Sequence, residues 1–600
     1  MQWQQQWQDS LVWIGRTYVL VVLACALAGT ALVRLTRWGR QFWRFAGPYF
    51  TPRRDWRPLA LAAAVVLLSV AGVRINVLLS YWNNGFYDAL QALDAARFWF
   101  FMRLFALLAA IHVLRVLVAF LAGQTLDIRW RTWMNERLTE DWLAGSAYYR
   151  ERFLAHPVDN PDQRIQVDIG SFVTASRTLA IGAIEAVVSL ASFTLILWDL
   201  SGPLTLGTLE APRAMVFLVY LYVLVASVFA FRLGRPLIGL NFLSEQLAAN
   251  FRYALIRVRE YAENIAFYRG EAVERRGLAE RFDAFIRNLW ALVFRSMKFD
   301  GFNLAVSQAA VVFPFLLQAQ RFFSGAIKLG DVMQTSQAFG QVQDALSFFR
   351  LSYDGFAQYR AALDRLSGFT SAAGQARALP SIAIEADATA LRLDALDVDR
   401  PDGSALLRGL SLQLAPGQAL LVQGASGAGK TTLLRALAGL WPYARGRVRA
   451  PLGADALFLP QRPYLPLGTL RAALAYPERE ADDTRLRAAL EQVQLAHLRE
   501  RLDEAADWSG TLSVGEQQRA AFARVLLKKP RIVYLDEASS ALDEGLEHAM
   551  YGLLRRELPE AIVVSVGHRS TLQAFHSHRL LLGGDARWTL VAAARPGSSG

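Results

Sequence analysis

Long apolar stretches alternate with polar, Arg-rich stretches over the first 353 residues, and this alternation predicts a bundle of membrane-spanning helices. A helix needs about 20 apolar residues to cross the hydrocarbon core of a bilayer. The stretches near this length are 11–33, 58–80, 98–122, 172–198, 214–231, 301–323 and 331–353. The last carries four glutamines and Asp344, so it is expected to line a wet pathway. The first is longer than the apolar part of a secretory signal and follows ten residues without a positive charge, which predicts a retained helix.

The polar stretches between these spans differ in charge, and the difference predicts their side of the membrane. Residues 34–57, the stretch after 122 and the stretch after 231 are rich in arginine, whereas 81–97 is not and 199–212 has no basic residue. Because cytoplasmic loops collect Lys and Arg, the basic stretches are assigned to the cytoplasm and the N-terminus to the outside. Residues 122–171 and 232–300 also show amphipathic helical spacing, which predicts helices that continue far out of the membrane.

The pattern changes after residue 368, where Ser, Ala, Gly and Pro accumulate and predict a linker. Beyond it, short apolar runs at 419–423, 531–535 and 562–566 are typical of buried strands that alternate with helices. We therefore predict an N-terminal helix with a basic cytoplasmic connector (1–57), an all-α polytopic membrane domain (58–370), a linker (371–388) and an α/β domain (389–600). The tail 595–600, rich in Gly and Ser, is expected to be irregular.

Composition supports a membrane protein and excludes other classes. Hydrophobic residues make up 54% of the chain and charged residues 19%, which excludes an intrinsically disordered chain. The single cysteine, Cys25, excludes an intrachain disulfide framework and a Cys-rich metal site. The net charge of +12 fits nucleic acid or an anionic membrane face, and the place of the arginines in alternate loops favours the membrane. Membrane lipids are thus expected partners and nucleic acid is not.

A phosphate-binding loop directly follows the apolar run 419–423. It fits G-x-x-x-x-G-K-[ST] and consists of Gly424, Ala425, Ser426, Gly427, Ala428, Gly429, Lys430, Thr431 and Thr432. Glycines let backbone N–H groups surround a phosphate at the start of a helix. Lys430 is expected to reach the β- and γ-phosphates of ATP, and Thr431 to ligate Mg²⁺.

Two acidic residues end the strand-like run 531–535. Asp536 is expected to hold Mg²⁺, and Glu537 to orient and deprotonate the attacking water. Two acids at a strand end are weak evidence alone, but they follow a phosphate loop in the order that an ATPase requires.

With these residues in place, 390–590 resembles the nucleotide-binding domain of ABC transporters, a P-loop NTPase fold. Residues 512–519 (LSVGEQQR) match the ABC signature, 459–461 the Q-loop, 540–543 the D-loop and 565–568 the H-loop. The resemblance implies a dimer that sandwiches two ATP molecules, each between one chain's phosphate loop and the other chain's signature. It implies that Ser513 and Gly515 contact the ATP of the partner, with Asp543 in the D-loop. Gln461 would sense Mg²⁺ and the membrane domain, Glu537 would be the general base, and His568 would hold the γ-phosphate.

The chain departs from the family pattern at three places. Val514 replaces the usual second glycine of the signature, and Glu516 replaces the common glutamine. Residues 396–401 lack the aromatic side chain that usually stacks on adenine. Activity is expected to survive the first two changes, whereas the third leaves the recognition of adenine open.

The membrane half resembles the exporter-type six-helix ABC fold, with one extra N-terminal helix. Segments 83–94, 160–168 and 459–469 are similar to a branch that contains bacterial transporters of the vitamin B12, bleomycin and antimicrobial-peptide type and the peroxisomal fatty-acyl transporters (subfamily D). The resemblance implies a half-transporter that works with a second copy of itself. In this branch the exporter fold can carry out uptake.

Two groups of membrane-half residues are candidates for coupling and for the transport cavity. Coupling to the ATPase domain is predicted for Asn160, Pro161, Asp162, Gln163 and Arg164, although an ordinary turn explains them too. Glu185, His112 and Arg115 are ionisable residues inside predicted spans, and such residues often face an aqueous cavity. A structural ion pair between helices explains Glu185 equally well.

The sequence thus predicts a multi-pass protein of the bacterial inner membrane whose ATPase domain is cytoplasmic. It is expected to work as a homodimer that uses ATP and Mg²⁺ to move a solute. Uptake of peptides or cobalamin-like hydrophilic solutes is favoured over export of lipids, acyl groups or drugs. An ATP-gated channel or regulator is disfavoured by the complete set of catalytic motifs, and the substrate and the direction of transport stay open.

Overall fold

The computed structural model describes residues 3–51, 55–157, 160–202, 204–206, 209–211, 213–387, 389–478 and 481–592. Arg53, Arg54 and the tail 595–600 lie outside these ranges. The chain forms two compact units. The first, the membrane unit, contains residues 1–140 and 159–370, and the second, the ATPase unit, contains residues 141–158 and 371–600.

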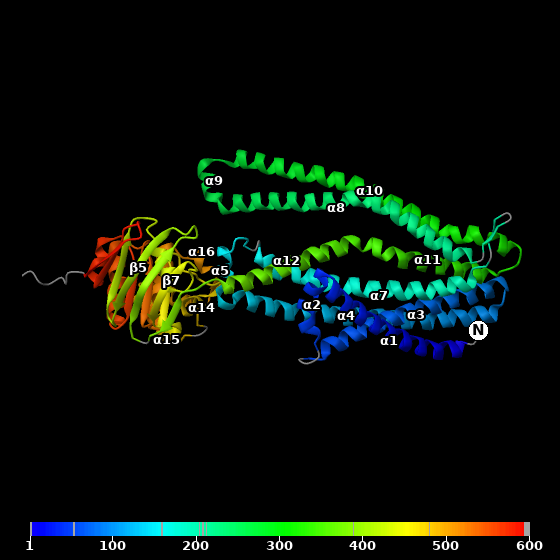
Figure 1. Cartoon of the computed structure of the whole chain (residues 1–600), viewed down its shortest axis with the longest axis horizontal. Coiled ribbons are helices and arrows are strands. Elements are labelled where there is room, and N and C mark those ends of the chain that lie inside the picture. The colour runs from blue at the N-terminus through cyan, green and yellow to red at the C-terminus, as the bar shows by residue number, and fades with distance from the viewer. Residues whose placement is uncertain are drawn as a thin grey trace, which may run out of the picture. The chain divides into compact units, whose positions relative to one another are not determined.

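The membrane unit is helical (Figure 1). Its long helices are α1 (Trp3–Leu35), α2 (Arg37–Phe50), α3 (Arg57–Gln91), α4 (Ala95–Leu143), α7 (Ile169–Leu200), α8 (Ala214–Glu260), α10 (Glu271–Phe323), α11 (Leu329–Leu351) and α12 (Tyr353–Ala378), the last of which ends in the ATPase unit. Within the described residues, six helical segments are long and apolar enough to cross a membrane, and they contain the first six predicted spans. Helix α11, which holds the polar seventh stretch, is not among them.

Three of these helices are much longer than a bilayer is thick. Helices α4, α8 and α10 contain 49, 47 and 53 residues, so each extends over roughly 70–80 Å. Helices α8 and α10 run side by side and are joined by the short α9 (Ala262–Tyr268) (Figure 1). The helices predicted for 122–171 and 232–300 are present, with interruptions after Leu143 and around α9, and their place beyond the membrane stays a prediction.

Helix α1 is attached to α3 by a buried arginine. Arg74 of α3 is 8% exposed, and its Nε donates to Ser10 Oγ at 3.0 Å while its Nη2 reaches Gln6 Oε1 at 3.5 Å. The guanidinium also lies over the Trp13 ring, 5.5 Å from its centroid. Three groups on one face of α1 thus satisfy a charge that would be costly to bury alone.

The ATPase unit is built on two large sheets, beside a two-stranded one formed by β9 (Gly468–Thr469) and β10 (Ala505–Ala506). The six-stranded sheet has the order β14-β13-β6-β12-β11-β8, and the four-stranded sheet has the order β3-β7-β4-β5. The first sheet consists of β6 (Ala419–Gly424), β8 (Ala456–Leu459), β11 (Ile532–Asp536), β12 (Ile562–Val566), β13 (His578–Leu582) and the antiparallel β14 (Trp588–Ala592). The second consists of β3 (Ala383–Ala386), β4 (Leu391–Asp399), β5 (Ala405–Leu414) and β7 (Ala444–Ala450).

Buried side chains on both faces explain the continuous apolar runs of the central strands. All five residues of β12 are buried, as are four of the five in β11. One face packs against helices α14 (Leu470–Ala475), α15 (Asp483–Gln492), α17 (Val514–Lys528) and α18 (Glu544–Glu557), and the other contacts α13 (Lys430–Leu437) and the second sheet. Parallel strands covered on both faces need no alternation of polar residues. The α/β prediction for this part of the chain is confirmed.

The segment 371–388, predicted as a linker, holds the last residues of α12 and then strand β3. Alanines of this helix end, Ala373 and Ala376, pack against Ala147 in the ATPase unit. Small residues here therefore allow close helix packing, which explains a composition that also suits a linker.

A buried histidine makes the stability of the ATPase unit depend on pH. His576 Nδ1 donates to Leu572 O (2.7 Å), so Nε2 accepts from the Ser565 hydroxyl (2.8 Å). Burial lowers the pKa of His576 from 6.5 to about 4. The folded state therefore holds a neutral imidazole, and protonation of the unfolded state below pH 6.5 favours unfolding. When the pH falls from 7 to 5, protonation of His576 in the unfolded state should lower the free energy of unfolding by about 2 kcal/mol. The measurement is the melting temperature of wild type and His576→Gln at both pH values; equal losses in the two proteins would contradict this prediction.

Candidate active site

The carboxyl ends of four parallel strands bring the predicted nucleotide residues to one edge of the sheet. Strand β6 leads into the phosphate loop, and β11 leads into Asp536 and Glu537. Gln461 and His568 follow β8 and β12 by two residues each. Because β12 pairs with both β6 and β11, and β11 pairs with β8, all four strand ends are neighbours. Such an edge is where open α/β sheets bind ligands.

The phosphate loop has the backbone that its glycines permit. Gly427 and Gly429 have φ values of 82° and 93°, which side-chain-bearing residues rarely adopt. Gly429 precedes α13, whose first residue is Lys430. The Lys430 Nζ donates to Gly424 O and Ala425 O at 2.9 and 3.0 Å, which holds the ammonium across the loop. The backbone N–H groups at the start of α13 and this cation together suit a phosphate.

Thr431 and Asp536 form an oxygen pair beside the loop. The Thr431 hydroxyl donates to Asp536 Oδ1 at 3.0 Å. Burial is the largest effect on Asp536 and raises the pKa of its carboxyl, and the Glu537 charge raises it further, against the Thr431 hydrogen bond. A hydroxyl and a carboxylate are the ligands by which Mg²⁺ attaches to a protein while it contacts substrate phosphates. The donor set therefore fits the predicted ion, whose remaining ligands would be phosphate and water oxygens.

Glu537 lies between the other two predicted catalytic residues. Gln461 Nε2 donates to Glu537 Oε2 at 3.1 Å, and His568 Nε2 is 3.4 Å from Glu537 Oε1. The Glu537 backbone has φ 50°, an uncommon value for a non-glycine residue, and its N–H donates to Val566 O. The neighbouring strand thus holds a strained turn that directs the carboxylate toward Gln461 and His568. The structure brings together all three residues that the sequence singled out.

The signature motif begins a helix that is capped from both directions. The Ser513 hydroxyl donates to Glu516 Oε2 at 2.8 Å. The Ser513 backbone N–H donates to the same Glu516 oxygen at 3.0 Å, and the Glu516 backbone N–H donates to Ser513 Oγ at 3.3 Å. This capping box gives Glu516 a structural role that glutamine shares. His497 Nε2 also lies 3.2 Å from Glu516 Oε1, a contact that sequence reasoning missed. Val514 is 48% exposed and leaves the start of α17 open to another molecule.

Gly515 and Asp543 have local roles at the D-loop. A Cβ at residue 515 would lie 3.3 Å from Ala541 O, so the glycine allows the signature helix to approach the D-loop closely. Asp543 caps α18 by accepting from Leu546 N at 2.7 Å. In α18, the buried Glu547 accepts from the hydroxyls of Ser539 and Thr571, which joins the residue before the D-loop to the segment after His568.

Gln518 is a positioning residue that sequence reasoning missed. Its side chain is fully buried, and its Nε2 donates to Gln461 O at 3.0 Å and to Ser540 Oγ at 3.2 Å. Its Oε1 accepts from Ala541 N at 3.0 Å. One amide therefore connects the Q-loop, the signature helix and the D-loop. Gln518 falls within the signature match 512–519, but nothing in the spacing indicated that its side chain is buried.

Replacing Gln518 with leucine should lower kcat for ATP hydrolysis by about 10- to 100-fold, because two acceptors and one donor lose their partner and the Q-loop and D-loop lose a common anchor. ATP affinity should change less than threefold, since Gln518 contacts neither Lys430 nor Thr431. The measurement is a steady-state ATPase assay together with nucleotide binding. Gln518→Glu, which keeps the acceptor for Ala541, should be intermediate. Gln492→Leu on the exposed face of α15 is the control, and equal kcat in the two leucine variants would rule out this role.

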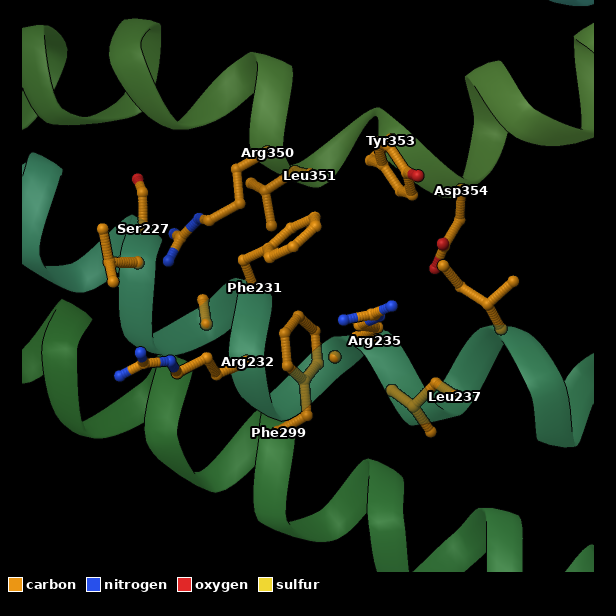
Figure 2. Close-up of a pocket in the computed structure, with 14 residues that line it drawn as sticks. Ser227, Phe231, Arg232, Arg235, Leu237, Phe299, Arg350, Leu351, Tyr353 and Asp354 are labelled. Atoms are coloured by element: carbon orange, nitrogen blue, oxygen red, sulfur yellow. The ribbon is translucent and has the colours of Figure 1, made fainter.

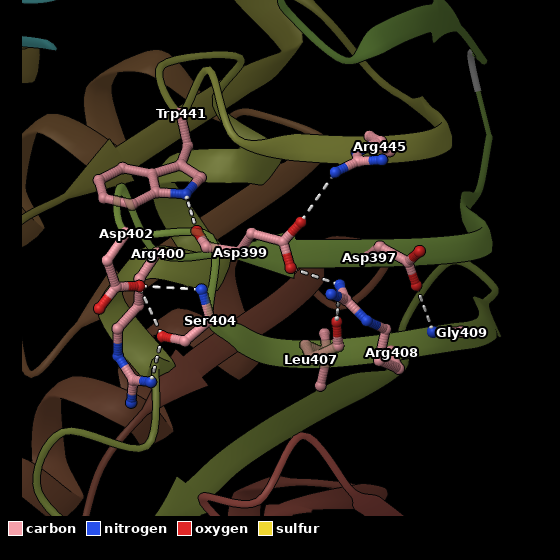
Figure 3. Close-up of polar contacts among 10 residues, drawn as sticks. All are labelled: Asp397, Asp399, Arg400, Asp402, Ser404, Leu407, Arg408, Gly409, Trp441 and Arg445. Carbon is pink, nitrogen blue, oxygen red and sulfur yellow. Dashed lines mark hydrogen bonds and ion pairs between the residues drawn. The ribbon is translucent and has the colours of Figure 1, made fainter.

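Residues 396–401, in which no aromatic side chain was found, form the end of β4 and the first part of the turn to β5. Figure 3 shows Asp399 between two arginines: Arg408 Nη1 is 2.5 Å from Oδ1, and Arg445 Nη2 is 3.1 Å from Oδ2. The Asp399 carbonyl accepts from Trp441 Nε1 at 2.8 Å. The next residue, Arg400, donates to Ser404 Oγ at 3.0 Å. The structure thus places a guanidinium in this turn.

Residues 141–158 pack into the ATPase unit although they precede it by more than 200 residues. Phe153 contacts the Trp441 ring edge-on at 5.2 Å and the Tyr443 ring at 6.1 Å. Arg150 donates to the carbonyls of Leu379 and Pro380 at 2.5 and 2.7 Å. An ion pair of 2.8 Å also joins Arg377 to Asp141. We call residues 141–157 the docking segment.

The predicted coupling residues lie just after this segment, in the membrane unit. Asn160 has φ 47° and precedes the short helix Pro161–Gln163, which includes Asp162. Arg164 pairs with Asp168 at 3.0 Å. Arg365 of α12 donates two hydrogen bonds, of 2.6 and 2.8 Å, to the same carboxylate. The structure therefore gives part of this motif a place in an ion cluster, and a coupling role for residues 160–164 stays a prediction.

The three cavity candidates lie on two helices. Arg115 of α4 donates to Leu68 O of α3 at 3.2 Å. His112 is one turn away on the same helix, and its Nδ1 has no hydrogen-bond partner among the described residues. Glu185 is half-buried on α7 and makes no ion pair with a described residue. Arg115 thus has a helix-packing partner, while His112 and Glu185 remain candidates for a polar pathway.

Comparison with known families matches residues 46–323 to the ABC transporter transmembrane region 2 and residues 407–540 to the ABC transporter family. An uncharacterized ABC transporter ATP-binding protein from Haemophilus influenzae is 46% identical over 593 residues, which cover 98% of this chain and 100% of that protein. The human lysosomal cobalamin transporter ABCD4 is 31% identical over 512 residues, with 78% of this chain and 82% of that protein covered.

Among solved structures, a bacterial Atm1-family ABC exporter with ATP bound superposes with a TM-score of 0.68. The match covers 88% of this chain and 94% of that chain, at 21% identity. The exporter-type fold that the sequence predicted is therefore confirmed.

Proposed function

This chain belongs to the ABC transporter family, and we propose that it works as a homodimer that takes up peptides or cobalamin-like hydrophilic solutes across the bacterial inner membrane. A fused membrane region and ATPase domain imply ATP hydrolysis coupled to transport. The substrate, the direction and the membrane are parts of the proposal. The excess of arginine in alternate loops supports a cytoplasmic location for the ATPase unit.

The arrangement around Glu537 carries the catalytic part of the proposal. Glu537 accepts a proton from the attacking water, and Gln461 fixes the carboxylate through the 3.1 Å hydrogen bond. His568, on the opposite carboxylate oxygen, donates toward the γ-phosphate. Lys430 and the N–H groups of the phosphate loop hold the phosphates, and Thr431 and Asp536 hold Mg²⁺, which when bound neutralises charge on the β- and γ-phosphates.

The open signature supports a homodimer. Ser513 and Val514 are exposed at the N-terminus of α17, where N–H groups and the helix dipole favour an anion. One chain carries a single phosphate loop and a single signature, so two copies complete two identical ATP sites. The γ-phosphate of each ATP would then lie against Ser513 and Gly515 of the other copy, with Val514 and Asp543 at the same boundary.

Arg400 supports a different mode of base recognition from that of an aromatic residue. A guanidinium is planar and stacks on nucleobases. Arg400 is in the turn beside β5, and Leu406 of β5 lies next to Gly429 of the phosphate loop, since a Cβ on that glycine would be 3.4 Å from Leu406 Cβ. We infer that Arg400 supplies the stacking surface for adenine.

Two observations support a hydrophilic solute, and a third supports the location. A relative with 31% identity carries the name of a cobalamin transporter. A relative that matches over the full chain is bacterial, which supports the inner membrane as the location. Polar side chains along α11, including the buried Gln334 and Gln343, supply hydrogen-bonding groups to a transport pathway.

Proteoliposomes with ATP outside test the direction and the solute, because only transporters whose ATPase unit faces outward are then active. Lumenal cobalamin or a labelled peptide should leave the vesicles in an ATP-dependent manner, and Glu537→Gln should abolish this release. Accumulation of external solute in the lumen would identify an exporter and overturn uptake. ATPase activity that stays unaffected by both solutes, with no movement of either, would contradict the substrate classes and leave the ATPase assignment intact.

A further inference from the structure

A cavity of about 570 Å³ lies between α8, α10 and the junction of α11 with α12 in the membrane unit (Figure 2). Its walls are mainly apolar and include Phe231, Phe299 and Leu351. Three arginines, Arg232, Arg235 and Arg350, line it together with a single carboxylate, that of Asp354. A volume of this size suits a small organic group.

The residues that line the cavity lie near the predicted cytoplasmic ends of three membrane spans. The predicted spans 214–231, 301–323 and 331–353, the last of which is polar, reach their predicted cytoplasmic limits at residues 231, 301 and 353. Phe231, Phe299 and Tyr353, within two residues of these limits, all line the cavity. The predicted spans therefore put the cavity where hydrocarbon gives way to headgroups on the cytoplasmic side.

The helices that form the cavity leave room for it. Pro236 interrupts the backbone hydrogen bonding of α8, because it has no N–H to donate to the Arg232 carbonyl. Gly234, one turn from Phe231, lets the Phe299 ring come close, since a Cβ there would lie 3.1 Å from the ring. The apolar floor is thus built by close packing of α10 on α8, and the arginines surround it.

The positive charge of the cavity is not neutralised inside the protein. Among the described residues, no carboxylate lies within 4.0 Å of the guanidinium groups of Arg232, Arg235 or Arg350. Arg350 donates to Asn303 Oδ1 and Ser347 Oγ, whereas its Nε is buried without a hydrogen-bond partner in the part of the chain that is described. Three arginines and one aspartate leave an excess of two positive charges next to an apolar wall.

We propose that this cavity binds the anionic headgroup of a phospholipid from the cytoplasmic leaflet, with the acyl chain along the Phe231 and Phe299 face. Guanidinium groups bind phosphate through paired, charge-assisted hydrogen bonds. Basic pockets between helices on the cytoplasmic side are suited to anionic headgroups. An anionic amphiphile from solution has the same chemistry, so the two sources must be separated by experiment.

The test titrates phosphatidylglycerol into the purified full-length protein in phosphatidylcholine nanodiscs and measures the melting temperature. Phosphatidylglycerol should raise it, and R232Q/R235Q should weaken the apparent affinity by roughly 25-fold, about fivefold for each arginine near an anionic surface. The control R252Q/R259Q removes two arginines from the same helix, far from the predicted membrane boundary. It should retain the wild-type affinity.

Equal loss in both double variants would overturn the proposal, because the effect would then be general attraction between charges. A variant-dependent shift with soluble glycerol phosphate alone would overturn the membrane source and assign the cavity to a free phosphate compound.

A photoactivatable phosphatidylglycerol analogue checks wild type directly, so the test does not depend on the folding of a variant. Label on peptides that contain residues 227–238 supports the site, and label only elsewhere rules it out.

Discussion

Replacing Glu537 with glutamine should lower the rate of ATP hydrolysis by at least about 100-fold while ATP still binds. Glutamine keeps the size of the side chain and one oxygen that can accept from Gln461 Nε2, so the geometry at the end of β11 should persist. What disappears is the ability to take a proton from water, and general bases contribute about 10²- to 10⁴-fold. The phosphate contacts of Lys430 and the loop do not involve Glu537, so nucleotide affinity should change little.

The measurement pairs an ATPase assay with nucleotide binding to the same preparation. Glu560→Gln removes an exposed carboxylate from the same unit and should leave the rate unchanged. A rate for Glu537→Gln above a tenth of wild type would mean that another group accepts the proton, with His568, whose Nε2 lies 3.4 Å from the native carboxylate, as one candidate.

Replacing Phe153 with alanine should reduce solute transport at least about tenfold while ATP hydrolysis persists. The Phe153 ring is the apolar contact of the docking segment with Trp441 and Tyr443. Truncating an aromatic side chain in a packed site costs about 3 kcal/mol, and half-burial reduces this toward 1.5 kcal/mol, which corresponds to a tenfold change in docking. The nucleotide residues lie on other strands and keep their hydrogen bonds.

The reason that Phe153 should affect transport lies in the contacts of Trp441. Its indole binds the Asp399 carbonyl, and Asp399 is held by Arg408 and Arg445 (Figure 3). Arg400 follows directly. A rearrangement of the β4–β5 turn on ATP binding therefore has a continuous path of packed groups to the docking segment, which continues helix α4.

The ratio of transport to hydrolysis is the quantity to measure. Phe153→Leu keeps much of the apolar contact and should recover most of the transport. Tyr148→Ala changes an exposed residue of the same segment, whose ring contacts Trp142, and should leave the ratio near wild type. An unchanged ratio in Phe153→Ala would show that force reaches the membrane unit by another route.

The nucleotide site could be predicted from the sequence because each of its residues is fixed by the end of a strand or the start of a helix. The run 531–535 identifies β11 and hence the position of Asp536 and Glu537, and parallel strands place their ends at one edge. Local spacing thus determines the site almost completely. The helices of the membrane unit could be predicted equally well, since the length and apolar content of each stretch are enough to identify them.

Contacts between distant segments could not be predicted in the same way. Phe153 is an ordinary apolar residue in an amphipathic segment, and nothing near it indicates Trp441, 288 positions away. Gln518 was also missed, because its partners belong to two loops whose approach depends on the packing of α17. The motif at 160–164 was given a coupling role from its place just before a span, and that role stays a prediction; its Arg164 pairs with Asp168, a carboxylate that Arg365 also binds within the membrane unit.

The attachment of α1 to Arg74 has a consequence for how this architecture can change in evolution. No residue in the most apolar window of α1 is buried, so little packing holds the helix in place. Its polar contacts with Arg74 instead satisfy a charge that belongs to α3. Deletion of α1 would leave that charge without its partners Gln6, Ser10 and Trp13 near the predicted outer end of the span. The extra helix and the arginine are therefore expected to be gained or lost together among relatives, although they belong to different spans.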